Sequence, residues 1–232
     1  MSPLSSLILA AVVWVLLHLG VSGTALRERM VAAIGAQPFR ITFSLASVAV
    51  LYWLATSYGK AGAVGVLWAS PHWLIAACVV LLLPALLLLV GSVTVPNPTL
   101  VGGERALAAN DAARGILRVT RHPMLWAFAL WAAANLLLFG TVAGVVFFGA
   151  FLVVAVAGMP SLDAKIRERN PPQWATFAQA TSNFPFAAIA QGRNRLVFAE
   201  IGVWRIALAV LAWFAIAPLF YGVPVWRMLV GG

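Results

Sequence analysis

The sequence predicts an all-α, polytopic integral membrane protein with about six transmembrane helices, and three observations support this fold class. Hydrophobic residues make up 63% of the 232 residues and charged residues 9%, whereas soluble domains carry about 25% charged residues. The mean hydropathy is +0.98. Apolar stretches long enough to cross a bilayer, about 17–25 residues, recur along the chain. We therefore expect a single transmembrane domain over residues 1–232.

The expected spans follow each other with loops of very different length. The first lacks the positive leading segment of a signal peptide, so we expect it to be a retained span. Only Gly140 and Thr141 separate the fourth span from the fifth, which predicts a tight helical hairpin. The six expected spans are residues 3–21, 40–58, 71–91, 123–139, 141–160 and 202–222.

The basic residues predict an orientation, because cytoplasmic loops of membrane proteins are enriched in Lys and Arg. Thirteen of the 15 lie in the first, third and fifth loops or at their edges, against Lys60 and Arg227 on the other side. We therefore expect both termini to lie on the non-cytoplasmic side of the membrane. The net charge of +9 follows from these loops and indicates no nucleic-acid partner.

The third loop is long, and long loops in compact proteins tend to be functional. We expect helical structure from about Glu104 to Val119. On that helix Arg114, Arg118 and Arg121 would share one face at i, i+4 and i+7. The face could meet water and lipid headgroups, or it could bind an anion such as phosphate or carboxylate.

The tripeptide Arg121-His122-Pro123 stands where this polar loop becomes a hydrophobic helix. Proline suits the first helical position, so His122 is expected near the N-cap. His18 lies near the inner end of the first span, at the depth expected for His122. His72 is expected at the opposite side of the membrane, where an interfacial role suffices.

Two neutral imidazoles on different helices can hold one iron from opposite sides, as in haem ligation. Two histidines alone make a poor zinc site, which needs three or four ligands. Arg118 and Arg121 could pair with the propionates of a haem or with the carboxylate of another cofactor. The residues by themselves leave a bis-histidine site and an anion site open.

Four stretches of the chain resemble the NnrU family of bacterial membrane proteins. The segment from Gly115 to Trp126 resembles the family signature, and His18 to Arg27 resembles its N-terminal motif. Asn97-Pro98-Thr99 resembles its central loop. Trp174, Phe177 and the run from Thr181 to Phe186 resemble its C-terminal loop.

The resemblance implies an association with denitrification and a similarity to plant 15-cis-zeta-carotene isomerase, a membrane enzyme with histidine-ligated haem b. Carried over by residue, His18 and His122 would be the axial ligands. Arg27, Arg118 and Arg121 would hold the propionates. If the protein is a catalyst, a redox-dependent isomerisation of a long, apolar polyene that enters from the bilayer is the implied reaction.

Two other functions stay open. One is a non-catalytic accessory role for respiratory nitrite or nitric oxide reductases. The other is methyl transfer from S-adenosylmethionine, because Arg-His-Pro also resembles the isoprenylcysteine carboxyl methyltransferases. Their acidic positions would correspond to Asp163 and Glu168, and their aromatic positions to Trp174 and Phe177. The sequence names no substrate and no protein partner.

Overall fold

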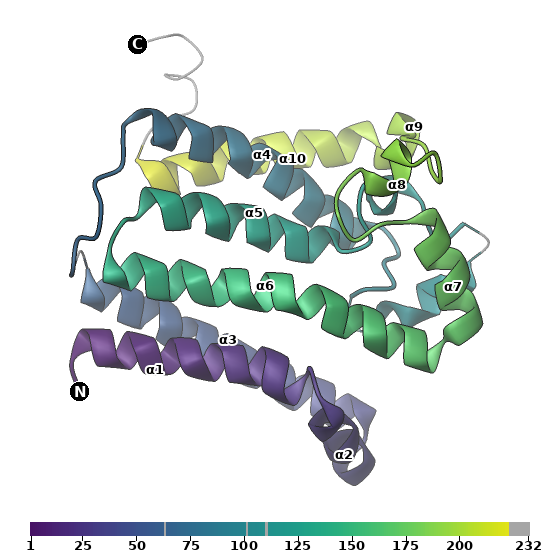
Figure 1. Cartoon of the computed structure of the whole chain (residues 1–232), viewed down its shortest axis with the longest axis horizontal. Helices are drawn as coiled ribbons and strands as arrows, with labels where there is room; N and C mark the ends of the chain where they lie inside the picture. The colour runs from purple at the N-terminus through teal and green to yellow at the C-terminus, as the bar shows by residue number, and fades with distance from the viewer. Residues whose placement is uncertain (63, 101, 110, 223–232) are drawn as a thin grey trace. The chain divides into compact units, whose positions relative to one another are not determined.

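The fold is built from helices, as the composition predicts. We describe residues 1–62, 64–100, 102–109 and 111–222 of a computed structural model (Figure 1). Arg227, which entered the topology prediction, lies outside these residues. The α-helices of the described residues are α1 (Pro3–Val15), α2 (Ala25–Ile34), α3 (Ala36–Ala61), α4 (Trp73–Thr94), α5 (Pro123–Leu138), α6 (Val142–Arg169), α7 (Pro171–Ala180), α8 (Ala187–Ala190), α9 (Phe198–Ile201) and α10 (Val203–Tyr221).

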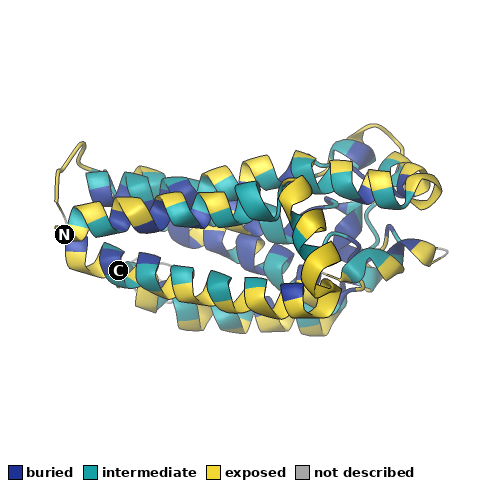
Figure 2. Ribbon diagram, turned by 90° about the horizontal axis from the view of Figure 1, so that it is seen from below, coloured by how far each residue is buried: buried dark blue, intermediate teal, exposed yellow. Residues whose placement is uncertain are grey.

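Five helical segments of the described residues are long and apolar enough to cross a membrane, which confirms the polytopic all-α class. They are Pro3–Val21, Ala36–Ala61, Trp73–Thr94, Val142–Arg169 and Val203–Tyr221. The remaining expected span, residues 123–139, corresponds to the shorter apolar helix α5, whose 16 residues rise about 24 Å. Large apolar side chains project from these helices, for example Leu45, Val48, Leu211 and Leu219, each at least 65% exposed. Yellow exposed positions recur along the helices in Figure 2, as expected for surfaces that face lipid.

Two of the expected boundaries differ clearly from the structure. Helix α3 begins at Ala36 rather than at residue 40, and α6 continues to Arg169 although we expected its span to end at residue 160. Pro160 lies inside α6 without ending it. Hydropathy marks where a helix leaves the apolar layer, but a helix can continue into water, so the polar last turns of α6 were missed.

The chain forms two compact units, and each is described by itself. The first contains residues 1–74 and 132–161, and the second contains residues 75–131 and 162–232. The predicted hairpin is confirmed, because only residues 139–141 separate α5 from α6, and its turn belongs to the first unit. A Cβ on Gly140 would lie 2.3 Å from the Trp68 carbonyl oxygen, so the turn requires glycine.

Within the first unit α1 packs on α3 through a small polar network. The hydroxyls of Ser6 and Ser57 lie 2.8 Å apart, and the indole N–H of Trp53 donates to Ser6 Oγ at 2.9 Å. Such interhelical hydrogen bonds are typical of helix pairs in bilayers, where water cannot satisfy polar groups.

In the second unit the loop between α4 and α5 is not the helix that the sequence predicted. It contains two short 3-10 turns, Gly103–Ala108 and Gly115–Arg118. Gly115 has φ of +59°, a conformation that interrupts a right-handed helix, and its N–H donates to the Glu200 carboxylate at 2.7 Å. The expected common face of Arg114, Arg118 and Arg121 therefore does not form.

The loops of the second unit nevertheless have an apolar core. Buried side chains from the third loop pack against the end of α6 and against α7. This core consists of Val95, Leu107, Ala113, Leu117, Ile166, Trp174 and Phe177.

Candidate functional site

His122 occupies the position that the sequence predicted for it. Helix α5 begins at Pro123, so His122 is its N-cap, and its carbonyl accepts from Trp126 N at 3.0 Å. The backbone N–H of His122 donates to Thr120 Oγ1 at 3.2 Å. The side chain is fully buried.

The imidazole of His122 contacts Asp163 on α6. Nε2 lies 2.6 Å from Asp163 Oδ1. Arg121 holds the same carboxylate from the other side: its Nη2 donates to Oδ2 at 2.7 Å and its Nε lies 3.0 Å from Oδ2 and 3.1 Å from Oδ1. We call these three residues the Arg121–His122–Asp163 triad. All three side chains lie in the second unit and are at most 17% exposed.

An aromatic side chain completes the surroundings of Arg121. The guanidinium carbon lies 5.4 Å from the ring centroid of Trp174, which is buried in α7. A cation at this distance from an indole face is attracted by the ring quadrupole. Arg121 is therefore fixed by both a carboxylate and an aromatic ring.

The C-terminal loop pairs with the backbone on both sides of the triad. Arg121 N donates to the Ser182 carbonyl at 2.9 Å, and Phe186 N donates to the Val119 carbonyl at 2.8 Å. The Asn183 carbonyl accepts from Trp126 Nε1 at 2.8 Å. Phe186 adopts φ of +64°, a region that a bulky side chain rarely enters.

The central loop also reaches the triad. Thr99 Oγ1 donates to the Arg121 carbonyl at 2.9 Å, and Asn97 Oδ1 accepts from the backbone N–H of Thr99 at 2.9 Å. Three of the four stretches that carry the family resemblance therefore converge on Arg121 and His122. Only the stretch around His18 lies in the other unit.

Arg118 belongs to a separate ion-pair cluster. Its Nε and Nη2 donate to the Glu200 carboxylate at 2.7 and 2.8 Å, and Nη1 donates to Asn194 Oδ1 at 2.7 Å. The more exposed Asp111 accepts from Nη2 at 3.0 Å. The hydrogen bonds that Arg118 donates to Glu200 lower the pKa of Glu200 and raise the pKa of Arg118.

His18 lies in the first unit, in a π-helical turn over Leu16–Val21 that follows α1. Such turns are rare and often mark functional sites. Its Nδ1 lies 2.9 Å from the Trp14 carbonyl oxygen, and its ring contacts those of Trp14 and Phe43, with centroids 4.0 and 5.6 Å away. Arg27, on α2 of the same unit, lies over the Phe39 ring at 5.7 Å. His72 is exposed just before α4.

His18 fits the role of a haem ligand as it stands. A ligating histidine usually donates its other ring N–H to a carbonyl or carboxylate, and Nδ1 of His18 has such an acceptor. No hydrogen bond to its Nε2 is found among the described residues. Its ring neighbours are apolar, as a haem requires.

His122, Arg118 and Arg121 do not fit the haem roles in this arrangement. Nε2 of His122 is held by Asp163, and both guanidiniums are already paired with carboxylates of the chain. In the part of the chain that the structure describes, no group of three or more His, Cys, Asp or Glu side chains is placed to hold a bare metal ion.

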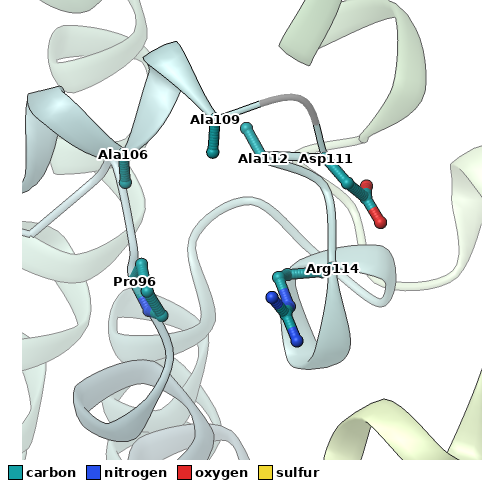
Figure 3. Close-up of a pocket in the computed structure, with 6 residues that line it drawn as sticks. All are labelled: Pro96, Ala106, Ala109, Asp111, Ala112 and Arg114. Atoms are coloured by element: carbon teal, nitrogen blue, oxygen red, sulfur yellow. The ribbon is translucent and has the colours of Figure 1, made fainter.

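A pocket of the second unit lies apart from the triad residues (Figure 3). Its volume is about 230 Å³, below the roughly 300–1,000 Å³ of most small-molecule sites. Pro96 and alanines form much of the lining, and Asp111 and Arg114 supply charged groups. We assign no cofactor to it.

Asp163 is the site residue that sequence reasoning missed as a partner of His122. The sequence pattern relates it only to an acidic position of the methyltransferases. The available signal was its place: it is the first acidic residue after the apolar part of α6. Intramembrane and boundary carboxylates usually pair with another ionisable group.

Comparison of the chain with protein-family models agrees with the resemblance of the four motif stretches to the NnrU family. The family model described as NnrU protein matches residues 6–225, nearly the whole chain. Neither the curated proteins nor the solved structures contain a match. The match includes all three histidines, the triad and all four motif stretches, and we conclude that the chain belongs to the NnrU family.

Proposed function

We propose that this membrane protein binds haem b and that His18 is an axial ligand through Nε2. The observation that carries the proposal is the contact between His18 Nδ1 and the Trp14 carbonyl at 2.9 Å. It orients the ring and leaves the electron pair on Nε2, the nitrogen that haem iron takes from histidine. The π-helical turn and the aromatic neighbours Trp14 and Phe43 support the same role.

The family resemblance implies His122 as a further ligand. For Nε2 of His122 to reach an iron, its contact with Asp163 must first be broken. Arg121 and Arg118 would hold propionates only after leaving Asp163 and Glu200, whereas Arg27 lies in the same unit as His18. The binding energy of the haem must therefore offset the loss of these internal pairs.

A haem would supply a redox-active iron beside lipid-exposed helices. The substrate class that suits such a site is a long, apolar polyene that enters from the bilayer. His18 would bind and orient the iron, and the rings of Trp14 and Phe43 would keep water away from it. An accessory role in nitrite or nitric oxide reduction would use the same haem without a polyene reaction.

The proposed location is the bacterial inner membrane with both termini on the non-cytoplasmic side. The support is the thirteen-to-two distribution of basic residues. Single cysteines at Lys60 and Arg195, in a Cys78→Ala background, should label from opposite sides of oriented vesicles. Labelling of both from one side would contradict the topology.

Absorption spectroscopy tests the haem. Detergent-purified protein, expressed with a haem precursor, should show a Soret band that sharpens with α and β bands after reduction by dithionite. No Soret band, even after titration with haem, would contradict the proposal. Binding of S-adenosylmethionine by such haem-free protein would favour the methyltransferase alternative.

A further inference from the structure

The pocket in Figure 3 lies where a membrane-spanning helix gives way to a polar loop. The 22 residues of α4 rise about 33 Å, close to the thickness of the hydrocarbon core, so the end of α4 lies near the lipid headgroups. Helix α4 ends at Thr94, and Pro96 is part of the pocket wall. The other lining residues come from the following loop of the same unit: Ala106, Ala109, Asp111, Ala112 and Arg114.

Arg114 gives the pocket a positive charge that is not already used. Its side chain is exposed, and its guanidinium has no ion pair or hydrogen bond within the part of the chain that the structure describes. Glu200, whose pKa is lowered chiefly by the hydrogen bond from Arg118 and to a lesser extent by the charge of Arg114, is held by other donors. Arg118 and Arg121, in contrast, are both paired with carboxylates.

Asp111, the other charged residue of the lining, does not cancel this charge. Its Oδ2 accepts from Arg118 Nη2 at 3.0 Å, so its own charge is already balanced. In Figure 3 the carboxylate of Asp111 points away from the alanines, whereas the side chain of Arg114 leaves its ribbon toward Pro96. The pocket therefore combines apolar walls with one available cation.

This combination suits a phosphate group that is attached to carbon. A guanidinium can bind phosphate through two parallel N–H donors. Proline and alanine walls favour the carbon atoms beside the phosphate of a lipid. The volume of about 230 Å³ is small for a whole cofactor, but a headgroup enters only in part. Basic pockets at a membrane boundary are recurrent sites for anionic lipid headgroups.

We propose that this pocket binds a phosphate group with Arg114 as the charged contact, and that at this depth the group belongs to an anionic phospholipid. Free phosphate offers the same chemistry, and the experiment below separates the two sources. The inference depends neither on haem nor on the side of the membrane that the loop faces.

Native mass spectrometry of full-length, delipidated protein in detergent tests the proposal, with dioleoylphosphatidylglycerol as the probe. Because Arg114→Gln removes a charged hydrogen bond at a partly exposed site, we expect this lipid to bind about fivefold or more weakly. Ala109→Leu, which narrows the pocket from an exposed position, should weaken binding as well. Arg105→Gln removes an exposed charge of the same loop outside the lining and should change binding by less than about twofold.

Two further probes identify what is bound. Dioleoylglycerol, which has the same acyl chains and no phosphate, should bind the unmodified protein and all variants alike. Calorimetric titration with inorganic phosphate reports on the free ion. Binding of free phosphate that requires Arg114, with lipid binding equal in all variants, would overturn the lipid as the source.

Other results would overturn the site itself. One is equal binding of the phospholipid by the unmodified protein, Arg114→Gln and Ala109→Leu, without binding of free phosphate. Another is an equal loss in Arg114→Gln and Arg105→Gln, which would reduce the effect to the general charge of the loop. The substituted side chains are exposed, so the variants should keep the thermal midpoint of the unmodified protein.

Discussion

Nε2 of His122 lies 2.6 Å from Oδ1 of Asp163, a residue 41 positions further along the chain. The contact joins the N-cap of α5 to the last turns of α6. Arg121 contacts the same carboxylate, so Asp163 has two partners near the start of the apolar helix α5. The arrangement explains how a charged pair can persist beside a membrane span: each polar group there has a specific partner, apart from the buried Nδ1.

Removal of Asp163 should strengthen haem binding rather than weaken it. In Asp163→Ala both Nε2 of His122 and the guanidinium of Arg121 lose the carboxylate that occupies them. Because a hydrogen bond to a charged group is worth about 1.5–3 kcal/mol, we expect haem affinity to rise about tenfold or more. Haem titration in detergent measures this, with Asp111→Asn as the matched carboxylate control.

The opposite outcome is informative as well. A fall in haem affinity in Asp163→Ala, with an unchanged thermal midpoint, would mean that the triad serves the haem as it stands. The proposal that Asp163 and haem iron compete for Nε2 of His122 would then be wrong.

The Arg118–Glu200 pair should contribute to stability in a pH-dependent way. Arg118 holds the pKa of Glu200 below its usual value of 4.5, and the pair's contribution is therefore fully present above about pH 4.5. It is lost as the pH falls through the lowered pKa of the folded state. We expect Glu200→Gln to cost about 1–2 kcal/mol near pH 7.

Thermal unfolding in detergent at several pH values checks this prediction. The difference between the unmodified protein and Glu200→Gln should shrink below pH 4. Asp111→Asn should change stability by less than about 1 kcal/mol, because Asp111 is 57% exposed. A constant difference between pH 3 and pH 7 would contradict the role of the ionised pair.

The turn between α5 and α6 should not tolerate a side chain at Gly140. A Cβ there would lie 2.3 Å from the Trp68 carbonyl oxygen, so Gly140→Ala must displace backbone and is expected to cost about 1–3 kcal/mol or more. Gly149, inside α6, is the matched control, because a Cβ at Gly149 meets nothing within 4 Å.

Melting curves of the two variants separate these cases. Gly149→Ala should be neutral or slightly stabilising, since alanine favours a helix over glycine by up to about 1 kcal/mol. Equal losses in both variants would mean that the observed contact of Gly140 with Trp68 is not what restricts the turn.

The all-α class and five of the six expected spans were readable from the sequence, because apolar length reports directly on membrane spans. The hairpin at Gly140 and the N-cap position of His122 were also predictable, since glycine and proline act through local backbone geometry. The helix over Glu104–Val119 was not, because tertiary contacts such as that between Gly115 N and Glu200 replace local hydrogen bonds. Glu200 lies 82 residues from its partner Arg118, and Asp163 lies 41 residues from its partner His122, and no local pattern reveals such pairs.

The central claim is that His18 ligates haem b, and one comparison of variants tests it most directly. Reduced-minus-oxidised spectra of the unmodified protein, His18→Ala and His72→Ala should be recorded at equal protein and haem concentrations. We predict that His18→Ala loses the α and β bands and most of the bound haem, whereas the exposed His72 can be replaced without effect. An unchanged haem spectrum in His18→Ala would contradict the account.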